Sequence, residues 1–104
     1  MSEWMDVAET RTIAPGEFVL VEVDEVSVVV FNIDGDFLAV EDMCSHDDAL
    51  LSEGMLDGSD VICPRHGARF CLRTGEALTP PAYEPVDCYP LRVEDGMLQI
   101  ATID

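Results

Sequence analysis

Basic residues are scarce in this sequence. It contains no lysine, and five arginines stand against 22 aspartates and glutamates, which gives a formal net charge of −17. Nucleic acids and anionic membrane surfaces repel such a chain, so neither is expected as a partner. A protein with a basic docking patch is the natural complement, although general solubility or a salty cytoplasm explains the same charge equally well.

Long apolar segments are also missing. The longest apolar run, Val26–Ile33, is interrupted by Ser27 and Asn32 and is far shorter than the roughly 20 residues that span a bilayer. The first six residues show neither a basic start nor an apolar stretch, so we recognise no signal peptide. We therefore expect a cytoplasmic protein, in which the four cysteines are metal ligands or core residues before they are disulfides.

The apolar content is high enough for a folded domain in spite of the charge. Apolar residues make up 48% of the 104 residues, which argues against disorder. A chain of this length can bury one modest core. We therefore expect a single domain spanning residues 1–104.

The two ends of the chain carry the pattern of antiparallel strands. Asp34-Gly35 and Asp95-Gly96 are strong hairpin signals, and each stands between two β-rich segments. The expected strands are Trp4–Ala8, Phe18–Val23, Val26–Ile33, Asp36–Val40, Leu91–Glu94 and Met97–Ala101. The sequence thus predicts an all-β base formed by residues 1–40 and 83–104.

The middle of the chain has a different texture. From about residue 41 to residue 82, glycines and prolines divide the chain into short segments. No segment has apolar residues repeating with the period of a helix. We expect a loop-rich insert with little or no helix, carried by the β base.

Histidine is also rare here, and its positions are informative. The only two histidines lie in Cys44-Ser45-His46 and Cys63-Pro64-Arg65-His66, each beside a cysteine. Two thiolates and two imidazoles suit a tetrahedral zinc ion or an iron–sulfur centre of mixed ligation. A catalytic Cys/His dyad would explain one pair but not its duplication.

The order of the residues within each pair bears on the choice of metal. Structural zinc sites usually take paired cysteines or paired histidines, whereas here each loop supplies one cysteine and then one histidine. In a binuclear centre both cysteines can bind one metal and both histidines the other. A zinc-stabilised interaction module stays as an alternative.

The two pairs resemble the motif of Rieske [2Fe–2S] proteins. The resemblance extends through Cys63–Phe70, then Thr74-Gly75, then Pro80-Pro81-Ala82, and follows the pattern of Rieske-type ferredoxins. It implies an antiparallel Rieske fold, with a β-sandwich or barrel-like base and a small cluster-binding subdomain at about 41–82. It also implies one [2Fe–2S] cluster, with Cys44 and Cys63 on the inner iron and His46 and His66 on the outer iron.

Neighbouring residues fit this resemblance. Pro64 lacks a backbone donor and stiffens the approach to His66, and Gly67 allows a tight backbone approach after that ligand. Thr74-Gly75 is interpreted as a turn, and Pro80-Pro81 as a rigid third loop that shields the cluster. Leu50 or Leu51 is expected to cover the cluster with apolar surface.

Four further positions predict the class of Rieske centre. High-potential members carry a disulfide where this chain has Ala49 and Arg65, and hydroxyl donors where it has Ala68 and Phe70. Fewer donors and a strongly negative chain stabilise the added electron less. The resemblance therefore implies a low-potential centre, near the bottom of the range of roughly −150 to +300 mV for Rieske centres.

Low-potential single-domain members resemble the ferredoxins of multicomponent aromatic-ring-hydroxylating dioxygenases, which serve aromatic hydrocarbon catabolism. The resemblance implies a monomeric carrier of single electrons from a flavin-dependent ferredoxin reductase to a terminal oxygenase. We expect that this chain is not an enzyme, because both of its histidines are assigned to the cluster and none is left to bind a catalytic iron. The small subunit of an assimilatory nitrite reductase is the alternative within the family, although that subunit often lacks the ligands.

Two cysteines and two arginines fall outside the motif's ligands. Cys71 and Cys88 are expected to be buried free thiols, with a redox or ligand role as the alternative. Arg65 and Arg69 either contact a docked partner or pair with acidic neighbours, for which Asp47, Asp48 and Glu53 are the candidates.

Overall fold

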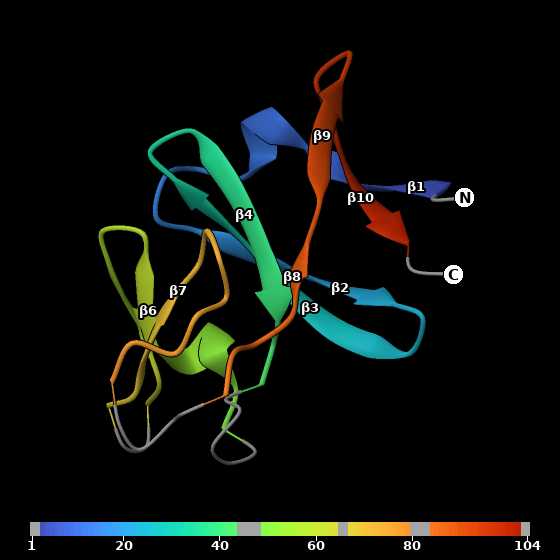
Figure 1. Ribbon diagram of the computed structural model, residues 1–104. Helices are drawn as coiled ribbons and strands as arrows, with labels where there is room; N and C mark the ends of the chain where they lie inside the picture. Colours follow the sequence, from blue (N-terminus) through green and yellow to red (C-terminus); the bar gives the residue numbers. More distant parts are fainter. Residues whose placement is uncertain (1–2, 44–48, 65–66, 80–83, 103–104) are drawn as a thin grey trace.

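The computed structural model describes residues 3–43, 49–64, 67–79 and 84–102. These residues form antiparallel strands and two short 3₁₀ helices (Figure 1). The elements are β1 (Glu3–Glu9), η1 (Thr10–Thr12), β2 (Phe18–Val23), β3 (Val26–Ile33), β4 (Asp36–Glu41), η2 (Leu51–Glu53), β5 (Met55–Asp57), β6 (Asp60–Ile62), β7 (Arg69–Cys71), β8 (Cys88–Tyr89), β9 (Leu91–Glu94) and β10 (Met97–Thr102). The prediction of an all-β fold with almost no helix is confirmed.

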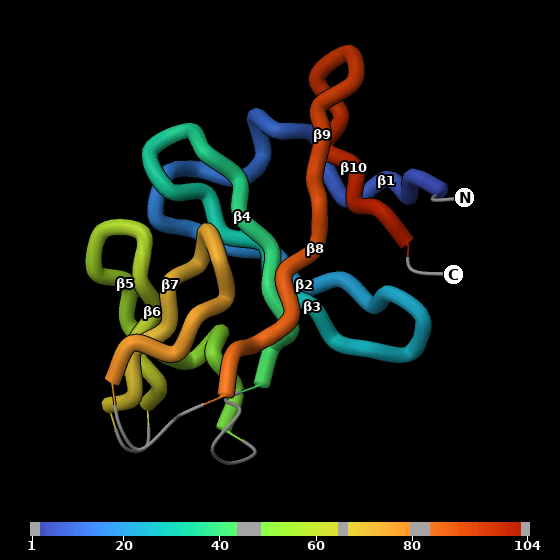
Figure 2. The backbone as a smooth tube through the Cα atoms, in the orientation of Figure 1, coloured from blue at the N-terminus to red at the C-terminus, as the bar shows by residue number. Residues whose placement is uncertain are grey.

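The strands form three antiparallel sheets. Two of them build the base, with strand orders β1-β10-β9 and β2-β3-β4-β8, and the third is the small sheet β5-β6-β7. Figure 2 shows the small sheet on one side of the β3–β4 hairpin and the β1-β10-β9 sheet on the other. The small sheet belongs to the insert, so the chain leaves the base after β4 and re-enters it at β8.

β3 explains this layering, because both of its faces are buried. Val28 and Val30 pack in a cluster with Leu98 and Ile100 of β10. Val29 and Phe31 point the other way and join the core of the small sheet. Alternate residues of a strand face opposite sides of its sheet, so an unbroken apolar run such as Val26–Ile33 suits the middle layer.

Tight turns close the hairpins of the base. In Asp34-Gly35 and Asp95-Gly96 both residues have positive φ, as a two-residue turn between twisted strands requires. Asp24 and Glu25 form the same kind of turn between β2 and β3, with φ of 49° and 70°. This third turn contains no glycine, so a positive φ costs free energy at both of its residues. It is therefore the most strained of the three turns.

The sequence did not predict the small sheet. Its three strands have three residues each, too short for an alternating pattern to stand out. The signal that could have revealed it is Gly58-Ser59, a two-residue turn between the paired Asp57 and Asp60, in which Gly58 has a φ of 61°. The insert is therefore less loop-like than expected.

No helix in the described part of the chain is long and apolar enough to cross a membrane.

Candidate metal centre

One of the four predicted metal ligands, Cys63, lies within the described residues. Cys44, His46 and His66 lie outside them, so their assignment as ligands stays a prediction. The structure does describe the segments that border both loops. Those segments come together at one end of the molecule, beside β7 and the end of β4 (Figure 1).

Cys63 directly follows β6 and begins a tight turn. Its backbone N–H donates to the carbonyl of Ala68 over 2.7 Å, and the N–H of Gly67 donates to the carbonyl of Cys63 over 3.1 Å. Gly67 has a φ of 71°, a conformation that favours glycine, and a Cβ there would meet no described residue within 4 Å. Its backbone conformation explains the glycine, and the close approach after the ligand stays a prediction.

The base of the first loop is fastened by a residue that the sequence analysis missed. Asp42 is 3% exposed, and its carboxylate accepts hydrogen bonds from the Ser52 backbone N–H (2.7 Å) and hydroxyl (2.8 Å). The Asp42 N–H donates in turn to the carbonyl of Ser27 in β3. These bonds tie residues 42 and 52 to each other and to the base. The sequence gave no sign of this role, because Asp42 is one of 22 acidic residues and belongs to no motif.

Both loops border the same apolar core. Ala49, which follows the first loop, packs in one buried cluster with Cys63 and Ala68, the two ends of the second turn. Leu51 and Phe70 are fully buried in the same cluster. The structure also separates the two leucines considered as a cover for the cluster, since Leu51 is a core residue and Leu50 is 41% exposed.

The surroundings of Cys63 suit a thiolate ligand of an iron–sulfur cluster. Its thiol is free and 2% exposed, and it stands at the start of a turn held by backbone hydrogen bonds. Ala49, Ala68 and Phe70 bring neither hydroxyl nor thiol into this core. The residues present therefore fit a buried cluster bound by soft sulfur on this side.

The predicted turn at Thr74-Gly75 is confirmed, and the structure gives a reason for its glycine. The N–H of Gly75 donates to the carbonyl of Cys71 (2.7 Å), and the carbonyl of Gly75 accepts from the N–H of Val86 (2.9 Å). Gly75 has a φ of 79°, and a Cβ there would lie 2.2 Å from the Val86 carbonyl oxygen. This contact ties the end of the insert to the segment that leads into β8.

Arg69 pairs within its own sheet. Its guanidinium lies 2.8 Å from a carboxylate oxygen of Asp57 and 3.2 Å from one of Asp60. Hydrogen bonds to these two carboxylates raise the pKa of Arg69 above its ordinary value. Of the residues suggested from the sequence, Asp47, Asp48 and Arg65 lie outside the described residues. Among those that are described, Arg69 pairs with Asp57 and Asp60 and not with Glu53.

Cys71 and Cys88 differ from the expectation of two buried thiols. Cys71 is only partly buried, and Cys88 is exposed. Both thiols are free.

Exposed apolar side chains lie next to the loop segments. Met43, Leu50 and Leu78 each stand within two residues of an undescribed segment and are between 41% and 44% exposed. Met55 is 72% exposed on the rim of a hollow of about 440 Å³, whose lining includes Cys63 and Pro64. This end of the molecule thus presents apolar surface in a very acidic chain.

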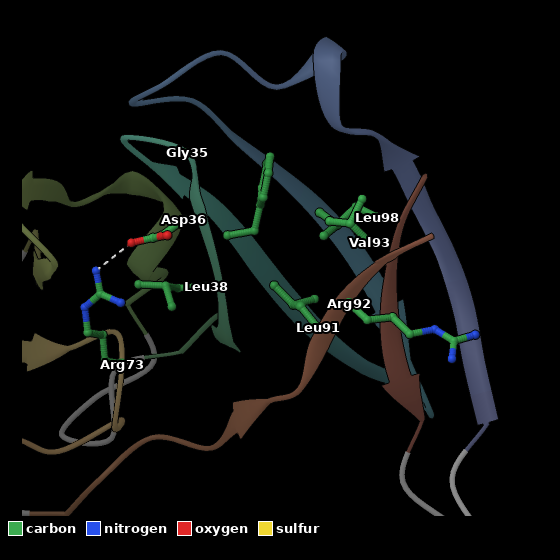
Figure 3. A pocket seen from close by; sticks show the side chains of 9 residues that line it. Gly35, Asp36, Leu38, Arg73, Leu91, Arg92, Val93 and Leu98 are labelled. Carbon is green, nitrogen blue, oxygen red and sulfur yellow. Dashed lines mark hydrogen bonds and ion pairs between the residues drawn. The ribbon is translucent and has the colours of Figure 1, made fainter. Parts of the chain in front are cut away.

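A second hollow lies away from Cys63, in the base (Figure 3). It has a volume of about 430 Å³ and is lined by Leu38 of β4, by Leu91 and Val93 of β9, and by Leu98 of β10. An ion pair between Arg73 and Asp36 (3.0 Å) stands at its side, and Arg92 points away from it. Its lining offers no histidine or cysteine for chemistry.

Comparison with known proteins agrees with the fold and the motif. The family model of the Rieske [2Fe–2S] domain matches residues 3–90. The biphenyl dioxygenase ferredoxin subunit of Pseudomonas sp. (strain KKS102) is 46% identical over 83 residues, which cover 79% of this chain and 76% of that protein.

Solved structures of ferredoxins superpose closely. The ferredoxin of carbazole 1,9a-dioxygenase from Nocardioides aromaticivorans IC177 matches with a TM-score of 0.92 and 30% identity, over 98% of this chain and all of that one. A chain in a complex of reduced oxygenase and oxidized ferredoxin of carbazole 1,9a-dioxygenase matches with a TM-score of 0.89 and 33% identity, over 94% and 92%. A putative NADH-dependent nitrite reductase small subunit from Mycobacterium tuberculosis matches with a TM-score of 0.87 and 27% identity, over 100% and 98%.

These similarities decide between the metals left open by the sequence. A Rieske domain carries a [2Fe–2S] cluster with mixed cysteine and histidine ligation, so the zinc-stabilised module is ruled out as the interpretation of this chain. The ferredoxin relatives are electron carriers and not catalysts. This chain belongs to the Rieske [2Fe–2S] family, as a ferredoxin that holds one cluster and transfers electrons.

Proposed function

We propose that this ferredoxin passes single electrons from a flavin-dependent reductase to a terminal aromatic-ring-hydroxylating oxygenase. The similarity to the biphenyl dioxygenase ferredoxin subunit, at 46% identity over most of both chains, carries this proposal. The ferredoxin–oxygenase complex of the carbazole system supports the oxygenase as a direct partner. A monomer in the cytoplasm suits a shuttle between two such partners.

We assign the cluster ligands to Cys44 and Cys63 on the inner iron and to His46 and His66 on the outer iron. The burial of Cys63 supports its place on the inner side, since a 2% exposed thiol cannot reach a docked partner. When bound, the cluster supplies a site that gains and loses one electron. Hydrogen bonds hold the described ends of both loops, between Cys63 and Ala68 and between Asp42 and Ser52.

The proposed carrier works at low potential. Ala68 and Phe70 are fully buried beside Cys63 and lack hydroxyl groups that could donate to cluster sulfur. The net charge of −17 also disfavours addition of an electron. The potential therefore lies near the lower end of the family range of about −150 to +300 mV.

Docking combines apolar contact with electrostatic steering. Met43, Leu50 and Leu78 form what we call the tip patch, the exposed apolar side chains that border the loop segments. Burial of such side chains against an oxygenase gives affinity that salt does not weaken. The net charge of −17 attracts basic docking patches on the partners and speeds their encounter at low salt.

The nitrite reductase small subunit is the second candidate, favoured by its match over the whole chain. Its identity of 27% is well below the 46% of the dioxygenase ferredoxin subunit. Cys44, His46, Cys63 and His66 are all present here, which suits an electron carrier.

Reconstitution tests the proposed function. The purified holoprotein is reduced without oxygen by a flavin-dependent ferredoxin reductase and NADH, then mixed with the terminal oxygenase of the biphenyl system, biphenyl and oxygen. We expect the ferredoxin to be reoxidised and the biphenyl hydroxylated only when all components are present. A His66→Ala variant serves as the control that loses the cluster or its transfer. Reoxidation by a nitrite reductase large subunit, but by no ring-hydroxylating oxygenase, would favour the second candidate.

A further inference from the structure

Cys71 is the last residue of β7 and begins the turn that contains Arg73 and Thr74. Hydrogen bonding, first with the Thr74 hydroxyl and then with the backbone N–H groups of Thr74 and Arg73, lowers the pKa of Cys71, although burial and Asp60 oppose this shift. The turn itself is held by the 2.7 Å bond from the Gly75 N–H to the Cys71 carbonyl. A thiolate stabilised in this way is a better nucleophile near neutral pH than an ordinary cysteine.

Cys88 lies against the same turn. Its sulfur is 3.9 Å from the carbonyl oxygen of Leu72, the residue after Cys71. It would also lie only 3.0 Å from a Cβ placed on Gly75. Partial burial of this sulfur, followed by the negative charges of Cys71 and Asp87, raises the pKa of Cys88. Leu72 and Gly75 both belong to the turn that begins at Cys71, so these two contacts place the Cys88 sulfur beside that turn.

Both sulfurs can be reached from solvent. Cys71 is partly buried and Cys88 is exposed, and neither belongs to the predicted ligand set. The two residues are 17 positions apart in the sequence, in different sheets, so the fold and not the chain brings them together. A low-pKa thiol beside a high-pKa thiol is the arrangement found in reactive dithiols.

We propose that Cys71 and Cys88 form a second redox site, a dithiol that a low-molecular-weight disulfide converts into an intramolecular disulfide. The Cys71 thiolate attacks one sulfur of glutathione disulfide, the S–S bond breaks, and one glutathione leaves as a thiolate. Cys88 then loses its proton and attacks the Cys71 sulfur, which releases the second glutathione. Two protein thiols are oxidised, and one glutathione disulfide is reduced to two glutathione molecules.

The bond would join β7, which follows the second cluster loop, to β8, which pairs with the strand that leads into the first loop. β7 follows the turn that begins at Cys63, and Cys71 is its last residue. Cys88 pairs with Val40 in β4, the strand that runs into the first loop. A disulfide between them ties the insert to the base, closes a loop of the chain and raises the denaturant midpoint of unfolding.

Titration of the holoprotein in anaerobic glutathione redox buffers tests the proposal. We expect oxidation to make the protein two hydrogens lighter. Digestion, after the remaining free thiols are blocked, should yield a single crosslinked peptide that contains Cys71 and Cys88. Unchanged visible absorbance and iron content show that cluster ligands do not take part. The Cys88→Ser variant should trap one glutathionyl group on Cys71. The Cys71→Ser variant should react at least about tenfold more slowly, because burial raises the pKa of the remaining Cys88 thiol.

Contrary results are well defined. If Cys71 and Cys88 each take up glutathione independently and no crosslinked peptide forms in any buffer, the dithiol is refuted. If Cys88 reacts faster than Cys71, the assigned order of attack is refuted.

Thr74 lies within the turn that the Gly75–Cys71 bond closes, and its hydroxyl oxygen accepts a hydrogen bond from the Glu76 N–H over 3.2 Å, which leaves the hydroxyl hydrogen free for the Cys71 sulfur. We assign Thr74 as the residue that positions the Cys71 thiolate. Thr74→Val removes the hydroxyl donor at similar side-chain size, so the pH at which iodoacetamide labels Cys71 should rise, while labelling of Cys88 shifts little. Thr74→Ser should restore the wild-type pH profile. An unchanged profile in Thr74→Val would contradict this role.

Discussion

At the scale of single residues, we expect the buried contacts at the described ends of the loops to hold the proposed ligands in place. Asp42 is the clearest case, because it has two donors from Ser52 and only 3% exposure. Asp42→Ala leaves these donors without their acceptor, so we expect a loss of about 1 to 3 kcal/mol in unfolding free energy. Chemical denaturation of the holoprotein measures this, and iron content should fall with it.

Asp36→Ala provides the matched control for that prediction. Asp36 also accepts from a side chain, Arg73 at 3.0 Å, but both partners are at least half exposed. An exposed ion pair contributes about 0 to 1 kcal/mol, so iron content should not change. Equal effects of the two substitutions would show that Asp42 does not fasten the loop.

Ala68 and Phe70 are two residues from which we infer a low reduction potential, because neither has a hydroxyl group. Phe70→Tyr adds one hydroxyl in the fully buried core that contains Cys63. A new hydrogen bond to the reduced cluster is worth about 0.5 to 1.5 kcal/mol, so we expect the potential to rise by roughly 20 to 60 mV. Protein-film voltammetry measures it, and Phe31→Tyr, in the same core but on β3, should raise it less. A fall in potential in Phe70→Tyr would contradict the account.

At the scale of elements, the hairpin between β2 and β3 carries avoidable strain. Asp24 and Glu25 both have positive φ, whereas the other two base hairpins place glycine at the second position of the turn. Glu25→Gly should therefore stabilise the protein by about 1 kcal/mol. Thermal unfolding of the holoprotein measures this. Gly96→Ala, at a φ of 79°, should destabilise by a similar amount, and a stabilising effect there would refute the reasoning.

The strands also show how much of the fold could be predicted from the sequence. β2, β3 and β9 have the predicted boundaries, because their length and β-branched residues give a clear pattern. β5, β6 and β7 were missed, because three-residue strands carry too little pattern and are held by tertiary contacts such as Phe70 and Val61 in the core. The Cys/His motif pointed to the site, since its chemistry is local in sequence. Asp42 and the proximity of Cys71 to Cys88 depend on the fold and could not be inferred from spacing.

At the scale of the whole molecule, charge and apolar surface should have separable effects on electron transfer. Leu50→Ser removes part of the tip patch, so it should slow transfer to the oxygenase several-fold at every salt concentration. Leu20→Ser is the control, because Leu20 is 54% exposed on β2, an edge strand of the base. Stopped-flow absorbance measures both rates. Equal slowing would place the docking surface elsewhere.

The acidic surface is tested by reversing one charge at two places. Glu53→Lys, beside the hollow that contains Cys63, should slow transfer at low salt and lose its effect as salt rises. Glu22→Lys makes the same change in net charge on β2 and should have a smaller effect. If both variants slow transfer equally, the overall charge steers the partners and a local docking site does not.

The central claim is that Cys44, His46, Cys63 and His66 together hold a [2Fe–2S] cluster. Electron–nuclear double resonance of the reduced protein with ¹⁵N-labelled histidine tests it most directly, because His46 and His66 are the only histidines in the chain. The account predicts coupling of two histidine nitrogens to the cluster, with one lost in each of His46→Cys and His66→Cys. A paramagnetic cluster without histidine coupling, held by the chain's four cysteines, would contradict it.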